Sequence, residues 1–283
     1  MDPLQFNAGQ FNAGQFNAGQ FSAAAPATVG TRAVLTRVDD QRWQAVEDDR
    51  TVGEGEASRR TDGRIFLSID TWHGAVFDRL AAAMLADLPG PLYTMVDEAD
   101  HDLTARWQRA GLTVRRREVE YHAATEQLIT GLGPGPAPSG VTILGLGAAR
   151  EPALREVYET VRAEVDARLG WDSMPVEVPP RPVGAALDPS RYAVAAVADR
   201  YVGLVRVVSR RRHARIGLLA VREDQRRRGI AKAMLAEVLG ALHRAGVETV
   251  STEVDERNSA ATALCEGIGA QRVSSALEMV RGA

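Results

Sequence analysis

Three consecutive arginines beside a glycine are the residues of this chain best suited to hold a ligand. Arg226 to Arg228 precede Gly229, and from residue 232 to 242 apolar side chains recur at the spacing of a helix. The apolar run at 216–221, just upstream, predicts a buried strand. The first N–H groups of a helix lack partners within the helix and favour anions, and glycine lets the backbone approach a ligand closely. Strand, basic loop and helix in this order predict a site for a phosphate ester.

The glycine loop differs from two familiar phosphate-binding loops. The chain contains neither G-x-x-x-x-G-K-[ST] nor G-x-G-x-x-G. It does contain R-x-x-G-x-A, formed by Arg226, Gly229 and Ala231. After a predicted strand at 247–254, a second motif has the spacing N-x-x-A-x-x-L followed by a glycine, and its residues are Asn258, Ala261, Leu264 and Gly269.

Together these motifs resemble those of the GNAT superfamily of N-acetyltransferases. The resemblance implies a mixed α/β fold that binds acetyl-CoA and transfers the acetyl group to an amine by direct attack, without a metal. In this interpretation a strand backbone pairs with the pantetheine arm, loop amides hold the pyrophosphate, and an asparagine contacts the arm from the other side. The residues so implied are Leu219, Ala220, Val221, Arg226, Arg227, Arg228, Gly229, Ile230, Ala231 and Asn258. Asparagine is also a common helix N-cap, and the two roles are compatible.

The implied reaction needs a base for the amine and an acid for the departing thiolate. Glu253 is the first candidate for the base, because polar and apolar residues alternate along the predicted strand that carries it. Asp172 and Glu177 are the alternatives. Cys265 occupies the place of the family's usual tyrosine acid, and Ala270 replaces a usual aromatic residue. A thiol is a weak hydrogen-bond donor, so packing of Cys265 on an apolar helix face, with water as the acid, is the other interpretation.

The first part of the chain repeats the second at a constant spacing of 158 residues. Val96–Glu98 corresponds to Val254–Glu256, and Gly111 to Gly269, without a gap. Upstream, the same spacing places a predicted helix at 75–88 opposite the helix of the glycine loop. This correspondence predicts two tandem copies of one fold.

The first copy is predicted to have lost its cofactor site. Opposite the glycine loop it has Ser68–His73, which contains no glycine and aligns Asp70 with Arg228. A carboxylate there would repel a phosphate, and the bulky Trp72 would obstruct the backbone. Trp72 and Trp107 could line an acceptor pocket, although packing in the core is the commoner role of tryptophan.

Low-complexity segments divide the chain. Residues 1–30 repeat Gln-Phe-Asn-Ala-Gly too few times for a solenoid, and predict a disordered tail, a repeat expansion or a segment added by cloning. We predict a degenerate first domain at 31–131, a linker rich in proline and glycine at 132–139, and an acetyl-CoA-binding domain at 140–283. A proline-rich segment at 170–188 is the part that covers the acceptor in the family, and its candidate substrate contacts are Trp171, Asp172 and Glu177.

Composition limits the classes of function. A hydrophobic content of 45% with 25% charged residues is typical of a globular protein, and a net charge of −3 does not indicate a nucleic-acid or membrane partner. The chain has no long apolar run, no signal-peptide pattern and one cysteine, which favours the cytoplasm. Its five histidines lack metal-ligand spacing, so we expect no metal. The sequence leaves monomer and homodimer open.

The resemblance implies N-acetylation, and the expected acceptor is a small-molecule amine, either a metabolite or an amine-containing antibiotic. Two alternatives remain from the sequence: a non-catalytic sensor or scaffold that binds acetyl-CoA, and an enzyme that acetylates a protein or peptide. The missing tyrosine is compatible with the first alternative. The extra domain and the proline-rich segment favour a small enclosed acceptor over the second.

Overall fold

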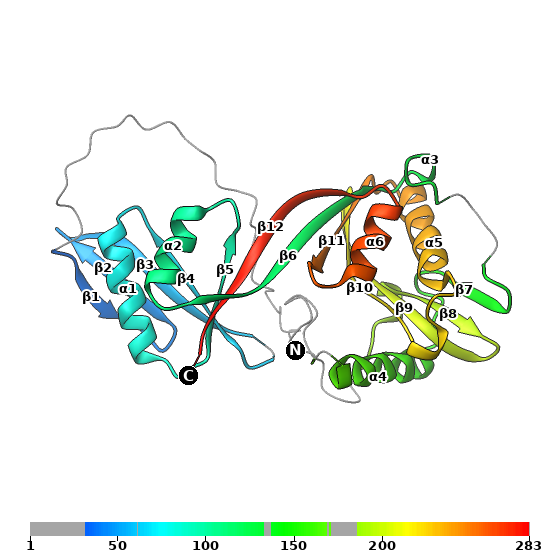
Figure 1. Ribbon diagram of the computed structural model, residues 1–283, viewed down its shortest axis with the longest axis horizontal. Coiled ribbons are helices and arrows are strands. Elements are labelled where there is room, and N and C mark those ends of the chain that lie inside the picture. The colour runs from blue at the N-terminus through cyan, green and yellow to red at the C-terminus, as the bar shows by residue number, and fades with distance from the viewer. Residues whose placement is uncertain (1–31, 61, 133–136, 169, 171–185, 283) are drawn as a thin grey trace, which may run out of the picture.

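A mixed sheet runs through both parts of the chain. The computed structural model describes residues 32–60, 62–132, 137–168, 170 and 186–282. Within them the strands follow the order β1-β2-β3-β4-β5-β12-β6-β11-β10-β9-β8-β7 (Figure 1). The strands are β1 (Val34–Arg37), β2 (Arg42–Glu47), β3 (Arg50–Arg59), β4 (Ile65–Thr71), β5 (Leu92–Asp97), β6 (Thr113–Ala124), β7 (Val141–Leu144), β8 (Tyr192–Val197), β9 (Arg200–Arg210), β10 (His213–Val221), β11 (Thr249–Asp255) and β12 (Gln271–Arg281).

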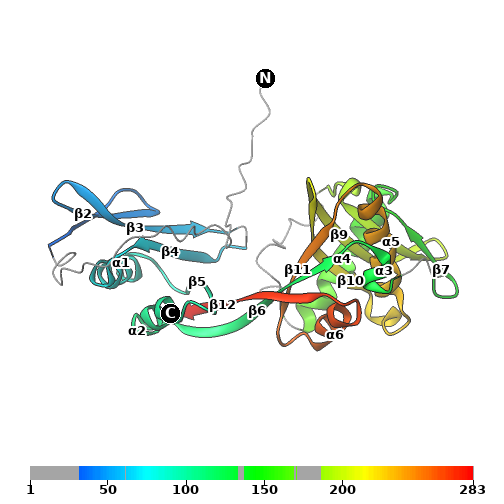
Figure 2. The same ribbon diagram turned by 90° about the horizontal axis from the view of Figure 1, so that it is seen from above.

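The helices cover the two ends of the sheet differently. They are α1 (Gly74–Asp87), α2 (His101–Arg109), α3 (Gln127–Thr130), α4 (Glu151–Arg168), α5 (Ile230–Arg244) and α6 (Ser259–Gly267). In the first half, α1 and α2 lie on one side of β2–β5 (Figure 2). In the second half, α5 and α4 pack against opposite faces of β8–β10. No helix in the described part of the chain is both long and apolar enough to cross a membrane.

The repeat predicted from the sequence is present in the fold. Helix α2 and helix α6 are related residue by residue by the spacing of 158, and so are the first residues of β6 and β12. The buried faces of α1 and α5 follow the same spacing, because Val76, Leu80 and Met84 correspond to Met234, Val238 and Leu242. These apolar residues recur every three or four positions, and this spacing places them on one helix face against the sheet.

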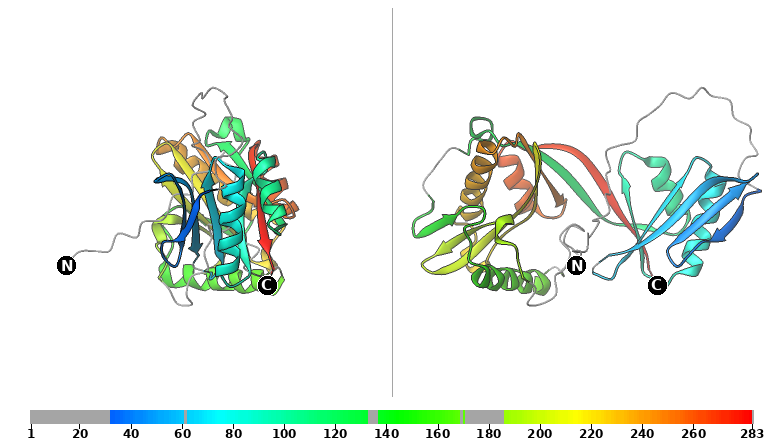
Figure 3. Two further views of the ribbon diagram at one scale, coloured as in Figure 1. Left: turned by 90° about the vertical axis from the view of Figure 1, so that its left-hand side faces the viewer. Right: turned by 180° about the vertical axis from the view of Figure 1, so that it is seen from behind.

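The two halves exchange their last strands. Strand β6, the last strand of the first half, pairs with β11 of the second half along Glu118–Ala124. Strand β12, the last of the chain, pairs with β5 of the first half along Ala276–Arg281. Between the halves β6 and β12 pair with each other, and they run side by side in Figure 1 and in the right-hand view of Figure 3. Each half therefore takes its sixth strand from the other.

The exchange follows an approximate two-fold axis. Glu118 pairs with Ala276, its own counterpart, at the centre of the β6–β12 ladder. On either side, Ala276 pairs with Asp97 and Glu118 pairs with Asp255, which are again 158 residues apart. Exchanged side chains also complete the two cores: β12 supplies Leu277 and Met279 to the first, and β6 supplies residues 119, 121 and 123 to the second.

Buried charges lie beside the crossing. Glu278 of β12 is fully buried and pairs with Arg64 at 3.3 Å, Arg115 at 2.5 Å and Arg116 at 3.0 Å. Arg116 also pairs with Glu118, which is 4% exposed. Burial raises the pKa of Glu118 to about 7, although Arg116 acts in the opposite direction.

Several elements lie outside the sequence predictions. The acidic stretch near residue 40 folds as the hairpin of β2 and β3, which turns at Asp48 and Asp49 with φ of 50° and 58°. Strands β6 and β12 were not predicted at all. The repeated tail lies outside the described residues, and the linker at 132–139 is only partly described, so the division of the chain there stays a prediction.

Glu118 gives a prediction about stability and pH. Because its pKa rises from 4.5 to about 7 on folding, the folded protein holds a proton that the unfolded chain releases between these values. The stability contributed by this carboxyl is complete below the unfolded pKa and is lost as the pH rises through the folded one. Glutamine at this position cannot titrate. We therefore predict that the free energy of unfolding of Glu118→Gln falls less with rising pH than that of the unaltered protein, and that the difference reaches at most about 3 kcal/mol. Urea unfolding of both proteins at several pH values measures the difference, and identical pH dependence would contradict the shift.

Candidate functional site

A fork between β10 and β11 is the centre of the candidate site. The two strands pair only from His213 to Arg215, against Thr249 to Ser251. Beyond Arg215, β10 continues with β9 on its other side and β11 continues with β6. The hydroxyl of Thr252 donates to the carbonyl of Ile216 at 3.0 Å where the strands separate. From this point the facing backbone edges of β10 and β11 have no strand partner among the described residues, so they can pair with an extended ligand.

A β-bulge shapes the β10 side of the fork. The register of β10 with β9 shifts between Ile216 and Leu218, and regular pairing resumes from Leu218 to Val221. A bulge bends its strand and increases the local twist. Leu219, Ala220 and Val221, predicted to face the cofactor arm, are thus on the diverging strand and are half-buried.

The glycine loop follows at the open end of the fork. It runs over residues 222–229, includes a 3₁₀ turn at Glu223–Gln225, and leads into α5 at Ile230. Arg227 and Gly229 have φ of 64° and 80°, so the chain turns through left-handed positions just before the helix. The predicted helix start at 232 is two residues too late, since Ile230 is buried and already helical.

Two of the loop arginines hold the loop in place through hydrogen bonds and an ion pair. Arg226 donates to the carbonyl of Val221 at 3.0 Å and pairs with Glu164 of α4 at 3.4 Å. Arg228 bonds to the side chain of Gln225 and donates to the carbonyl of Ser139 at 3.3 Å. Their guanidinium groups therefore hold the loop and add positive charge, while the amides at the start of α5 remain available for an anion.

Charged and polar residues form the floor beside the fork. Arg215 pairs with Glu253 at 2.5 Å, and the two side chains are 29% and 23% exposed. Glu120 of β6 stands opposite Glu253 in the strand register. His122, on the same face as Glu120, lies with its ring centroid 5.7 Å from that of His213. We refer to Arg215, Glu253, Glu120, His122 and His213 as the acceptor floor.

Hydrogen bonds fix this floor. His122 bonds to Glu120 at 2.9 Å, and Ser274 of β12 donates to the same carboxylate at 2.8 Å. His213 bonds to Ser251 at 2.9 Å and to Thr249 at 3.1 Å. Burial opposes ionisation of Glu120, but the bonds from His122 and Ser274 outweigh it, so its pKa is lowered and it is a carboxylate at neutral pH. Burial, followed by the nearby charge of His122, lowers the pKa of His213 and favours its neutral form.

The family of the second half follows from its sequence. Residues 156–270, which include the fork, the glycine loop and most of α4, match the model of the acetyltransferase (GNAT) family. This segment is a GNAT acetyltransferase domain. No curated protein matches the chain in sequence.

Solved structures show that most of the chain has the tandem form of this fold. A GCN5-related N-acetyltransferase from Sphaerobacter thermophilus is 17% identical, with a TM-score of 0.63 over 87% of this chain and 82% of that one. A tandem GNAT protein from the clavulanic acid biosynthesis pathway is 16% identical, with a TM-score of 0.58 over 85% and 82%. A GCN5-related N-acetyltransferase from Kribbella flavida is 12% identical, with a TM-score of 0.54 over 88% of each chain. At these identities the likeness concerns the fold.

The GNAT domain places Asn258 and Cys265 on α6. Asn258 is the N-cap, and its side chain accepts from the N–H of Ala261 at 3.1 Å. It is exposed and follows β11 at the open end of the fork, so its contact with the cofactor stays a prediction. Cys265 is buried with Val119, Tyr121 and Val254, on the sheet face opposite the acceptor floor. Burial raises the pKa of its thiol to about 11.

The first half keeps the fork but lacks the rest of the site. Thr94 donates to the carbonyl of Leu67 at 2.9 Å, the counterpart of the bond between Thr252 and Ile216. However, β3 and β4 pair without a register shift, and Trp72 and His73 alone join β4 to α1. The alignment of Asp70 with Arg228 is therefore wrong: Asp70 lies within β4, and the loop at 222–229 has no counterpart of similar length.

The two tryptophans of the first half have different environments. Trp107 is 1% exposed and packs edge-on against Phe77 with ring centroids 5.0 Å apart, so it belongs to the core. Trp72 is 91% exposed.

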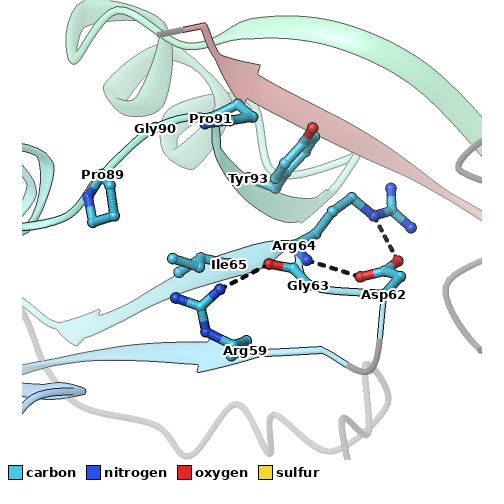
Figure 4. A pocket seen from close by; sticks show the side chains of 9 residues that line it. All are labelled: Arg59, Asp62, Gly63, Arg64, Ile65, Pro89, Gly90, Pro91 and Tyr93. Atoms are coloured by element: carbon cyan, nitrogen blue, oxygen red, sulfur yellow. Dashed lines mark hydrogen bonds and ion pairs between the residues drawn. The ribbon is translucent and has the colours of Figure 1, made fainter.

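A pocket of about 270 Å³ lies near the start of β4 and β5, where Arg64 bonds to Asp62 and Arg59 donates to the carbonyl of Gly63 (Figure 4). It is far along the chain from the GNAT loop and has no such loop of its own.

Some site residues could not be placed and others were not predicted. Trp171, Asp172 and Glu177 lie outside the described residues. Glu120, His122, His213 and Arg215 were not singled out from the sequence. For the β6 pair the available signal was the alternation of polar residues along 116–122, but nothing local shows that β6 lies beside β11. Among the described residues, no three His, Cys, Asp or Glu side chains form a group that could hold a metal.

Gly229 gives a direct test of the anion site. We predict that Gly229→Glu weakens acetyl-CoA binding at least about a hundredfold, because it places a carboxylate at the positive end of α5. Gly246→Glu is the matched control: this glycine also has φ of 80°, follows the other end of α5, and has no atom within 4 Å of an added Cβ. Calorimetric titration of each variant measures the affinity. Equal weakening in both variants would assign the effect to backbone strain, and tight binding by Gly229→Glu would place the phosphate site elsewhere.

Proposed function

We propose that this protein transfers the acetyl group of acetyl-CoA to the primary amine of a small molecule. The observation that supports this most strongly is the sequence of bulged strand, glycine loop and helix start beside the fork, which occurs once in the described chain. An extended arm can pair with the free edge of β10, and a pyrophosphate fits the amides at the start of α5. The residues proposed to hold acetyl-CoA are Leu219, Ala220, Val221, residues 226–231 and Asn258.

The acceptor floor lies where the amine would approach. Glu253, directly or through one water, would take a proton from the incoming ammonium and leave a neutral nitrogen. That nitrogen attacks the thioester carbonyl carbon, the C–S bond breaks, the nitrogen loses a second proton as the amide forms, and the thiolate takes up one proton. Arg215 keeps Glu253 oriented, because the two side chains are paired at 2.5 Å. Overall, one proton passes from the ammonium to solvent and the products are the amide and free CoA.

Water and Cys265 are the two candidate sources of the thiolate's proton. The raised pKa of Cys265, about 11, means that the thiol holds its proton through the neutral range. Its neighbours Val119, Tyr121 and Val254 give it an apolar environment. We favour water as the donor on these grounds.

A small acceptor is supported by the architecture. Strand β6 joins the floor to the first half, and α4 packs on the neighbouring strands β8–β10 (Figure 1). A peptide acetyltransferase needs an open groove for an extended chain, which this arrangement does not favour.

The proposal predicts turnover of primary amines by the purified protein. Release of the CoA thiol, measured with a thiol-reactive dye over a panel of amino sugars and diamines, is the assay. Glu253→Gln should lower kcat/KM for the amine by about 10²-fold or more while acetyl-CoA affinity stays unchanged. Glu248→Gln is the control, because Glu248 also pairs with an arginine, Arg212, and directly precedes β11. Binding of acetyl-CoA without turnover of any amine would support a sensor instead.

Variants of Cys265 distinguish water from the thiol as the proton donor. We predict that Cys265→Ala and Cys265→Ser keep kcat within about threefold of the parent and leave acetyl-CoA affinity unchanged. A fall of about 10²-fold in the alanine variant, with activity retained by serine, would make the thiol the acid. Thermal midpoints of both variants control for loss of packing in the cluster around this residue.

A further inference from the structure

The exchanged strand β6 brings residues of the first half into the acceptor floor. Glu120 and His122 come before the predicted linker, yet they stand beside β11 of the GNAT domain. Glu120 pairs in register with Glu253, and both side chains lie on the face away from α6. Residues directly opposed on neighbouring strands have Cβ atoms about 5 Å apart, so the two carboxylates border the same space.

Like charges in this position repel, and the surroundings show how the pair is tolerated. Arg215 holds Glu253 from the β10 side. His122 and Ser274 hold Glu120 from β6 and β12. The side chains of Glu120 and Glu253 are 32% and 23% exposed, so each keeps an accessible part. A cation between them would be attracted to both carboxylates at once.

Building on the proposed acetyl transfer, we propose that Glu120 is a specificity-determining residue of the acceptor subsite. Together with Glu253 it receives the amine as an ammonium ion, and His122 acts as a positioning residue that holds the carboxylate of Glu120. The acceptor is then a cationic amine without a carboxylate beside its amino groups, of the diamine or polyamine class. An acceptor with its own carboxylate near the amine is repelled by the same pair.

The net reaction releases one proton. The ammonium binds between the carboxylates, and one N–H proton passes to Glu253 and on to solvent. The neutral nitrogen then attacks as described above. Glu120 contacts the ammonium but neither gains nor loses a proton in the net reaction.

Two probes of equal length test the charge preference. They are 1,4-diaminobutane and 4-aminobutanoate, which differ in having an ammonium or a carboxylate at the far end. With the unaltered protein we expect kcat/KM for the diamine to exceed that for the amino acid at least about tenfold. Equal rates, or a preference for 4-aminobutanoate, would overturn the proposal.

Variants assign the preference to Glu120. Glu120→Gln keeps the shape and removes the charge, and we expect it to raise KM for the diamine at least about tenfold with a smaller change in kcat and an unchanged affinity for acetyl-CoA. Glu56→Gln, at an exposed position of β3 in the first half, is the control for loss of one charge and should change neither. A diamine KM unaltered by Glu120→Gln would overturn the assignment.

His122 is tested as a positioning residue by a conservative pair. His122→Gln keeps an N–H donor for Glu120 and should retain most of the diamine preference, whereas His122→Leu should lose it. Loss in both variants, or in neither, would overturn this role.

Calorimetry separates failure of this proposal from failure of the proposed function. Titration with 1,4-diaminobutane, with and without acetyl-CoA, reports acceptor binding without turnover. Acetyl-CoA binding without any preference for the diamine would overturn the role of Glu120 and leave the cofactor site standing. Binding of the diamine that is weakened by Glu120→Gln, in a protein that binds no acetyl-CoA, would support the subsite and remove the acetyl transfer.

Discussion

The pairing of β6 with β12 is the interaction on which the rest of this structure depends. Without it, β12 and β6 would be edge strands with unpaired backbone groups at the middle of the molecule. The exchange also places Leu277 and Met279 in the first core and Val119 and Tyr121 beside α6. Neither half has a complete sheet or a complete core of its own. The buried ion pairs of Glu278 lie at the same place, and an incompletely formed crossing would leave these charges unpaired.

This construction explains why the first half keeps the fold although it lacks the bulge and the loop that form the candidate cofactor site of the second half. Its fork is still closed by the threonine bond of Thr94, but β4 has no bulge and reaches α1 after two residues. What the first half still provides is the last strand of the GNAT domain, including Glu120 and His122 on the acceptor floor. The first half therefore contributes a strand to the candidate site of the second half although it has no counterpart of the loop at 222–229.

The sequence and the structure agree where the information is local. The glycine loop, the helix that follows it and the repeat of 158 residues are patterns of neighbouring residues, and all three are present. Strands β6 and β12 were missed because their partners lie more than a hundred positions away in the chain, and polar residues such as Arg116 and Glu118 conceal their burial. The ungapped alignment of Asp70 with Arg228 failed because a change in loop length leaves the flanking periodicity intact. The side chains around Glu253 could not be anticipated for the same reason as β6: they converge only when the strands are exchanged.

The central claim is that two copies of one fold share one cofactor site. The number of acetyl-CoA sites per chain tests this claim most directly. Calorimetric titration of acetyl-CoA into the full chain measures this number together with the affinity. One site per chain is the predicted result, because only the second half joins a bulged β10 to the loop at 222–229 and the start of α5. Two sites would show that the fork of the first half also binds the cofactor, and the absence of binding would contradict the assignment of the glycine loop.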